Sequence, residues 1–198
     1  MGVNRITAEF VYSLDSEPIR NGFVEYEDDG TIIRTGKCGL EEEVMPGAIV
    51  PGFVNAHCHV ELSHLHKKFR KGTGMAGFID QINELRDWAG FEVKQQLVRK
   101  WMDKMWNDGV SAMADISNDD ASFDVKKSHP MYTRTFLEVF GSEPEMCEGV
   151  MKDVRDLNEL ADKAGIDAAP TPHSCYTMSP QLLSASSAAG LESGYLSY

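Results

Sequence analysis

The sequence predicts a mixed α/β fold, with a small β unit over residues 1–50 followed by strand and helix units around a parallel sheet over residues 51–198. Two observations lead to this prediction. The first fifty residues contain short β-type segments broken by turn signals such as Asp28-Asp29-Gly30. From Val50 onward, strand-like apolar runs alternate with helical stripes, which is typical of βα units.

The amino-terminal segments are predicted in chain order from their composition. Residues 6–14 alternate loosely in polarity, and residues 22–26 and 31–35 flank the Asp28-Asp29-Gly30 turn. An exposed acidic run, Glu41-Glu42-Glu43, precedes Ala48-Ile49-Val50. We expect these segments to form a small β unit before the main domain.

The next segments give the first two βα units. The first buried strand is expected over residues 49–56, and 110–116 form the second, ending near Asp115 and Ser117. Residues 118–130 are polar and are expected to form a loop or short irregular segment. Gly109 should end the second of two helices that lie between these strands. These helices are predicted because apolar residues recur at helical spacing, first Phe78, Ile82, Leu85 and Ala89, then Val93, Leu97, Trp101 and Met105.

The remaining segments repeat the pattern. Strands are expected over residues 132–140, 166–170 and 194–198. Between them, one helix should end at Gly165, and another should begin at Ser179-Pro180 and be closed by Gly190. An eight-unit barrel needs roughly 250 residues, so this chain would hold the first four to five units.

His57 and His59 stand at the end of the apolar run Pro51-Gly-Phe-Val-Asn-Ala. Successive side chains of a strand point to opposite faces, so both imidazoles should share one face while Cys58 points away. Two such imidazoles form half a metal site, because a catalytic zinc normally has a third protein ligand and an open position. The alternative, two buried histidines that only satisfy backbone groups, would be an unusual use of one core face.

Other polar residues have weaker signals. Glu61 should share the face of His59 and could contact a substrate hydroxyl or orient a ligand. Asp115 and Glu138 end strands, but either could equally be a cap or a surface carboxylate. His64 and His66 lie in a polar loop and are expected to be solvated. The later segment Gly72-Thr-Gly-Met-Ala-Gly77 matches GxGxxG, yet it follows a basic loop instead of a strand, which argues against a dinucleotide site.

Composition narrows the classes of partner and compartment. With 19 basic and 31 acidic residues, the net charge of −12 argues against nucleic acid or an anionic membrane and favours a small-molecule partner. The four cysteines form no CxxC pair, which indicates reduced thiols in a cytoplasmic protein. The sequence has no run of about 18 apolar residues, so it predicts no membrane-spanning helix. An open strand edge at the end of the chain would favour homo-oligomers.

Two motifs resemble a known family. Pro51-Gly-Phe-Val-Asn-Ala-His-Cys-His59 is similar to the first-strand motif of the amidohydrolase superfamily, and Pro172-His-Ser-Cys-Tyr-Thr-Met-Ser-Pro180 is similar to a fourth-strand motif of its aminohydrolase branch, which includes deaminases and chlorohydrolases. His59-Val-Glu61-Leu-Ser63 followed by Gly77-Phe-Ile most resembles aminodeoxyfutalosine deaminase-like proteins. The resemblance implies a partial TIM (β/α)8 barrel preceded by part of a β-sandwich.

The resemblance also implies roles for individual residues. His57 and His59 match the paired metal ligands, His173 matches a histidine that contacts substrate, and Glu61 and Tyr176 fall in motifs that line the same pocket. In the family, a third metal histidine, a catalytic glutamate, another histidine and a metal-binding aspartate come from later strands. We therefore expect this chain to be an amino-terminal portion that is inactive by itself, with its catalytic residue unknown.

The implied chemistry is hydrolysis of a C–N bond in a small nucleoside or heterocycle by water activated on one divalent ion, Zn²⁺ in the first place and Fe²⁺ as the alternative. Two other hypotheses remain open from the sequence. One is a non-catalytic half-barrel that binds a small molecule, and the other is an ordinary α/β domain, such as a nucleotide binder, in which the HxH pair is incidental.

Overall fold

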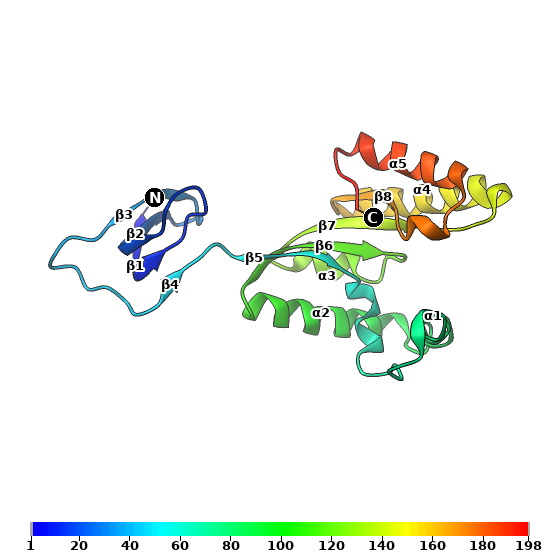
Figure 1. Ribbon diagram of the computed structural model, residues 1–198, viewed down its shortest axis with the longest axis horizontal. Coiled ribbons are helices and arrows are strands. Elements are labelled where there is room, and N and C mark those ends of the chain that lie inside the picture. Colours follow the sequence, from blue (N-terminus) through cyan, green and yellow to red (C-terminus); the bar gives the residue numbers. More distant parts are fainter. Residues whose placement is uncertain (1, 198) are drawn as a thin grey trace. The chain divides into compact units, whose positions relative to one another are not determined.

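The structure of the protein is a computed structural model that describes residues 2–197. The chain divides between Gly52 and Phe53 into two compact units. Figure 1 shows the elements of each unit along the chain. The first unit is a small sheet, and the second is a mixed α/β unit with a parallel sheet.

The first unit is a four-stranded sheet with the order β3-β2-β1-β4. Strands β1 and β2 pair antiparallel, as do β2 and β3, whereas the short β4 pairs parallel with β1. Ala8, Val11, Phe23 and Val24 are its buried apolar residues, and the Arg5 guanidinium lies 3.5 Å from the centre of the Phe23 ring. The strands are β1 (Val3–Val11), β2 (Ile19–Glu27), β3 (Ile32–Lys37) and β4 (Ala48–Ile49).

The strand predicted over residues 49–56 is divided between the two units. Ile49 pairs with Val11 in the first sheet, and the first strand of the second unit is β5 (Phe53–Cys58). Pro51 lies at this break, and a proline has no backbone N–H to continue a ladder of hydrogen bonds. The boundaries of the predicted strand were therefore wrong at both ends.

The second unit has a four-stranded parallel sheet with the order β5-β6-β7-β8. Its strands after β5 are β6 (Val110–Ser117), β7 (Tyr132–Val139) and β8 (Ala168–Pro172). The helices are η1 (Val60–Leu65), α1 (Gly74–Leu85), α2 (Phe91–Asn107), α3 (Phe123–Ser128), η2 (Pro144–Met146), α4 (Cys147–Ala164), η3 (Cys175–Thr177) and α5 (Pro180–Glu192).

The helices of this unit follow the order of the strands. Neighbouring helices contact one another in the sequence α2, α3, α4, α5, while α2 packs on β6 and α5 packs on β8. Two apolar clusters fill the space between helices and sheet, one around Leu137 and Met151 and the other around Met102 and Met113. Because the four strands are parallel, their carboxyl ends lie at one edge of the sheet, where the side chains that follow them can meet.

Several predicted helix ends are confirmed. Gly109 and Gly165 follow α2 and α4 with φ angles of +93° and +75°, values in the left-handed region where glycine is favoured. The Ser179 hydroxyl accepts a hydrogen bond from the Leu182 N–H at 3.3 Å, with Pro180 in the first turn of α5. These residues act as the local signals predict.

Other predictions for this unit were wrong. The polar segment 118–130 contains the short helix α3, because Phe123 and Val125 are buried against the core. No strand forms over residues 194–197, where Gly194 turns the chain at a φ of +84° and the Ser197 N–H donates to the Thr171 hydroxyl. Residue 198 lies outside the described residues. The described sheet therefore has four parallel strands.

Among residues 2–197, no helix combines the length and apolarity that crossing a bilayer requires.

Gly190 lies inside α5 instead of ending it, and the helix approaches the backbone of β8 at this residue. A Cβ atom at this position would lie 2.8 Å from the Pro170 carbonyl oxygen, and that oxygen belongs to rigid backbone. We expect Gly190→Ala to lower the free energy of unfolding by about 1–3 kcal/mol. Gly149→Ala in α4, where a Cβ meets nothing within 4 Å, is the matched control and should raise it by about 0.5–1 kcal/mol. Chemical denaturation measures both, and equal effects would contradict the close approach.

Candidate metal centre

His57 and His59 lie at the carboxyl end of β5 with their ring centres 5.4 Å apart. The intervening Cys58 points elsewhere, since its Sγ lies 3.8 Å from Met113 Sδ and 3.5 Å from Asp115 Oδ1. Burial raises the pKa of the Cys58 thiol, which keeps it protonated. The alternation expected of a strand is thus seen, with two imidazoles on one face and the thiol on the other.

His173 joins this pair from the other edge strand of the sheet. It follows β8, and its backbone N–H donates to the Val139 carbonyl at 3.0 Å. Its ring centre is 5.3 Å from that of His57 and 5.2 Å from that of His59, and one nitrogen from each ring lies within 4.8 Å of the others. Three strand spacings in a flat sheet would separate β5 from β8 by about 14 Å. The sheet must therefore curve so that these side chains converge.

The histidines have electrostatic properties that suit metal ligands. Burial lowers the pKa of His59 and His173 against the opposing effect of Glu138, so these imidazoles favour the neutral form. Within the described residues, the Nδ1 atoms of both rings are buried and have no hydrogen-bond partner. A buried nitrogen without a partner is costly, and a bound cation would satisfy a nitrogen that carries a lone pair.

A chain of polar contacts connects Glu61 with His173. The Glu61 carboxylate accepts hydrogen bonds from the backbone N–H of Asn118 at 2.6 Å and of Asp119 at 3.2 Å. The side-chain amide of Asn118 donates to Glu61 at 3.0 Å and also to Glu138. Glu138 Oε1 in turn lies 3.7 Å from His173 Nε2. Burial first, and then the charge of Asp119, raise the pKa of Glu61 to about 7.

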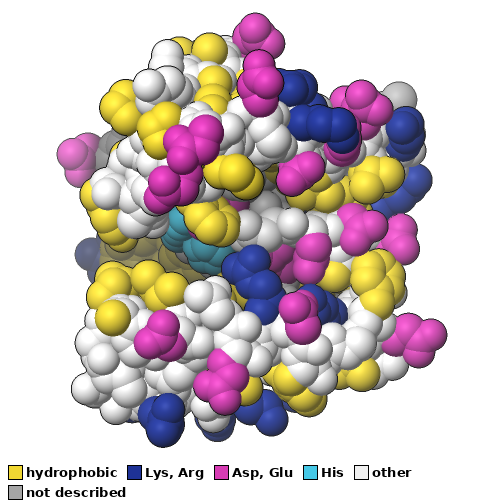
Figure 2. All heavy atoms as spheres, turned by 90° about the vertical axis from the view of Figure 1, so that its right-hand side faces the viewer, with side chains coloured by type: hydrophobic (Ala, Val, Ile, Leu, Met, Phe, Trp, Pro, Cys, Tyr) yellow, Lys and Arg dark blue, Asp and Glu magenta, His cyan; other side chains and the backbone are white. Residues whose placement is uncertain are grey.

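Two cavities border the site. One of about 420 Å³ adjoins His59 and is lined chiefly by apolar groups such as Leu65, Phe69 and Trp101. A smaller one of about 200 Å³ adjoins Glu61 and is lined by polar groups that include Lys94 and Asn118. Figure 2 shows histidine side chains inside a recess, with hydrophobic and charged groups along its rim. The site thus offers both an apolar and a polar surface to a small molecule.

The structure places the other predicted residues differently. Tyr176 on η3 is 81% exposed, whereas His59 and His173 are half-buried and His57 is exposed. His64 is 3% exposed, and its ring nitrogens lie 3.0 and 2.8 Å from the carbonyl oxygens of Glu61 and Arg86, so the prediction that it is solvated was wrong. His66 is exposed, with its ring centre 4.4 Å from that of Trp101.

Sequence reasoning missed Asn118 and Lys126, and it left Asp115 and Glu138 outside the site. Asn118 and Lys126 fell in a segment read as a polar loop. The only signal for Glu138 was its place near the end of a predicted strand, which a surface carboxylate would share. The GxGxxG segment leads into α1 from a loop, with no strand directly before it. This context agrees with the prediction that the segment is not a dinucleotide site.

Comparisons with known proteins find a curated relative and solved structures of similar fold. No protein-family model matches the chain. An adenosine deaminase from Helicobacter pylori is 27% identical over 131 residues, which are 64% of this chain and 31% of that protein. The solved aminofutalosine deaminase from Helicobacter pylori, in complex with methylthio-coformycin, superposes with a TM-score of 0.75 at 21% identity, covering 98% of this chain and 50% of its own.

A third similar protein is the solved adenosine deaminase from Xanthomonas campestris with bound zinc, with a TM-score of 0.65 at 16% identity. It is matched over 97% of this chain and 48% of its own. This chain therefore spans about half the length of the similar solved structures and less than a third of the curated relative. The resemblance to deaminases that the two sequence motifs predict is thereby confirmed, and the solved structures share the fold of this chain.

Proposed function

We propose that this chain provides the histidine ligands of a metal-dependent aminohydrolase, which cleaves a C–N bond in a small nucleoside or heterocycle. His57, His59 and His173 would together bind one divalent cation, Zn²⁺ in the first place and Fe²⁺ as the alternative. This proposal gives His173 the role of a metal ligand, in place of the substrate contact that the family resemblance implies for it. The observation that carries the proposal is the convergence of these three rings, with one nitrogen from each within 4.8 Å of the others.

The residues present fit such an ion. Zinc accepts imidazole nitrogens readily, and it binds them in the neutral form that burial favours for His59 and His173. Among residues 2–197, nothing pairs with the Nδ1 atoms of these two rings, so each still lacks a contact. Three protein ligands would leave a position open for water, as in catalytic zinc sites.

A bound divalent ion would supply hydroxide near neutral pH by lowering the pKa of a coordinated water towards about 7. The chain's own residues orient the site. Glu138 lies beside the His173 ring, and the Asn118 amide holds Glu138 and Glu61 together. Glu61 borders the polar cavity, where its carboxyl group can contact a substrate hydroxyl or ring nitrogen. Tyr176 remains a predicted substrate contact.

The relatives support this proposal at the level of reaction type. They are named as deaminases, and one of them was solved with bound zinc. At identities of 27% or less they do not choose a substrate for this chain, so we assign only the class of small nucleosides and heterocycles.

Zinc titration of the purified chain tests the metal site. We expect one zinc ion per chain by calorimetry. Ala replacement of His57, His59 or His173 should each weaken zinc binding by more than the roughly 10- to 100-fold that is typical for loss of an outer partner of a metal site. His66→Ala is the matched control, because His66 is exposed and packs against Trp101, and it should leave the affinity unchanged.

The variants also separate two roles for His173. Unchanged zinc affinity in His173→Ala, together with weakened binding in the other two, would return His173 to the substrate-contact role that the motif implies. Failure of the unmodified chain to bind zinc or iron(II) would contradict the proposed metal site as a whole.

The pKa of Glu61 predicts a pH dependence of stability in metal-free protein. Its folded value of about 7 exceeds the ordinary value of 4.5, so the folded state holds the proton more tightly. The resulting stabilisation is present below pH 4.5 and is lost as pH rises through 7. Between pH 5 and 8, the unfolding free energy of the unmodified chain should fall by about 2–3 kcal/mol relative to that of Glu61→Gln.

Urea denaturation at a series of pH values measures this difference. Exposed Glu92 on α2 provides the control, and Glu92→Gln should follow the unmodified chain across the same range. A constant difference between the unmodified chain and Glu61→Gln would show that Glu61 is not held in a buried, proton-retaining position.

A further inference from the structure

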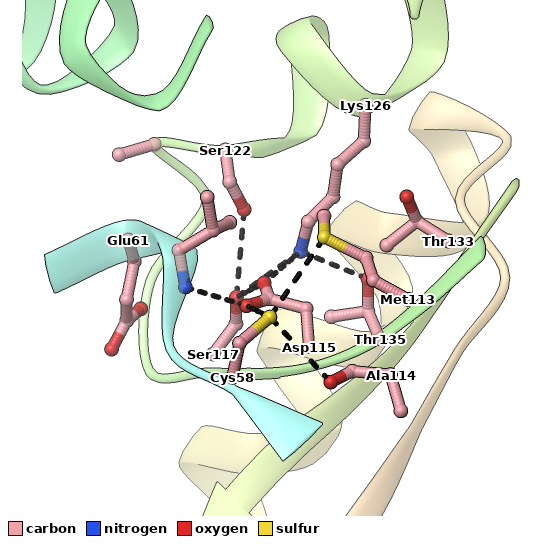
Figure 3. A network of polar contacts seen from close by, with 12 residues as sticks. Cys58, Glu61, Met113, Ala114, Asp115, Ser117, Ser122, Lys126, Thr133 and Thr135 are labelled. Carbon is pink, nitrogen blue, oxygen red and sulfur yellow. Dashed lines mark hydrogen bonds and ion pairs between the residues drawn. The ribbon is translucent and has the colours of Figure 1, made fainter. Parts of the chain in front are cut away.

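A buried ion pair lies behind the β5 strand, on the side away from the histidine rings. Asp115 on β6 and Lys126 on α3 are 0% and 1% exposed at their side chains, and Lys126 Nζ lies 2.6 Å from Asp115 Oδ2. Figure 3 shows Lys126 extending from its helix toward Asp115, with Ser117, Thr135 and Cys58 gathered around the pair. Neither charge enters the mechanism described above.

The second oxygen of Asp115 contacts the segment that carries the metal ligands. Asp115 Oδ1 accepts a hydrogen bond from the Val60 backbone N–H at 2.7 Å and a weaker one from the Cys58 thiol at 3.5 Å. These two donors belong to the residues immediately before and after His59. One carboxylate oxygen therefore binds the backbone directly after a proposed metal ligand and contacts the side chain of the residue before it.

The other contacts keep this carboxylate in place. Ser117 donates to Asp115 Oδ2 at 3.0 Å, and Lys126 also donates to the hydroxyls of Ser117 at 3.2 Å and Thr135 at 2.9 Å. The carboxylate thus contacts β6 and α3 directly, and Lys126 links it to β7. Its other oxygen contacts the residues of β5 and η1. Each charge is fully hydrogen-bonded, which is the condition under which a buried pair persists.

Stability alone does not account for the pair. Buried ion pairs can often be replaced by apolar residues of similar volume at no loss of stability, whereas outer partners of a metal site commonly change metal affinity when they are lost. An apolar pair in this position would pack the core, but it would leave the Val60 N–H without an acceptor.

We propose that Asp115, held by Lys126, is a positioning residue that fixes the backbone around His59 so that its ring meets those of His57 and His173. This inference rests on the proposed metal site and adds to it a residue that touches neither metal nor substrate. What matters is the hydrogen bond that Asp115 accepts from Val60, more than the charge of the pair.

Two matched double variants separate the hydrogen bond from the charge. Asp115→Asn with Lys126→Met removes both charges and retains a side-chain oxygen that can accept the Val60 N–H. Asp115→Ala with Lys126→Met removes both charges and the acceptor. Both variants leave the Ser117 and Thr135 hydroxyls without Lys126, so the loss of those contacts is common to the two.

Zinc affinity, the visible spectrum of the cobalt(II) form and the exchange rate of the Val60 amide hydrogen are the readouts. We expect zinc affinity of the Asn variant within about threefold of the unmodified chain, and a 10- to 100-fold loss in the Ala variant. The cobalt spectrum should change only in the Ala variant. Amide exchange at Val60 should accelerate in that variant alone. A cooperative thermal unfolding transition in each double variant confirms that both proteins are folded.

The outcomes distinguish this inference from the proposed function. Equal zinc affinity in the two double variants, or equal exchange at Val60, would overturn the role of the hydrogen bond while leaving the three-histidine site standing. Absence of zinc binding in the unmodified chain would overturn the proposed function and the positioning of a metal ligand together. Faster Val60 exchange in the Ala variant would then define a purely structural contact.

Discussion

The arrangement of residues at the carboxyl ends of the parallel strands depends on the buried carboxylate of Asp115. An ionised carboxylate without exposure to water is tolerated only when its charge is paired and its oxygens are hydrogen-bonded. Lys126, Ser117 and the Val60 N–H together meet that condition. Because these partners come from α3, β6 and η1, these elements cannot shift independently without leaving part of a charge unsatisfied.

Strand β6 acts as the centre of two polar networks. Asp115, near its end, connects to the segment around His59, and Asn118, directly after it, connects Glu61 to Glu138 and so to His173. Side chains on or directly after the inner strands thus reach the segments that carry the histidines at the two outer strands. The parallel pairing of β5, β6, β7 and β8 makes this arrangement available, since all four strands end at the same edge.

Local patterns predicted much of this fold. The period of two along a strand correctly separated His57 and His59 from Cys58, and the Ser179-Pro180 pair and Gly165 marked helix ends as expected. The approach of His173 to the pair depended on a family resemblance, because strand order and sheet curvature arise from contacts distant in sequence.

The residues that were missed share a physical cause. Lys126 is buried because its partner lies on another element, eleven residues earlier in the chain. His64 is buried because the Arg86 carbonyl, twenty-two residues later, faces its ring. In both cases the sequence shows an ordinary polar residue in a polar segment, and only the tertiary partner distinguishes it from a solvated one. The predicted strand over 194–198 failed for a related reason, since the described residues 194–197 have no strand pairing to stabilise them.

The distribution of charge around the histidines favours a cation over an anion. Neutral imidazoles leave the charge of a bound divalent ion unbalanced, so nearby carboxylates are needed to compensate it. Asp115 is already neutralised by Lys126, whereas Glu138 lies beside His173 with only the neutral amide of Asn118 and the imidazole as polar neighbours among the described contacts. Burial, and then the negative charges of Asp119 and Asp115, raise the pKa of Glu61 because they disfavour its ionised form.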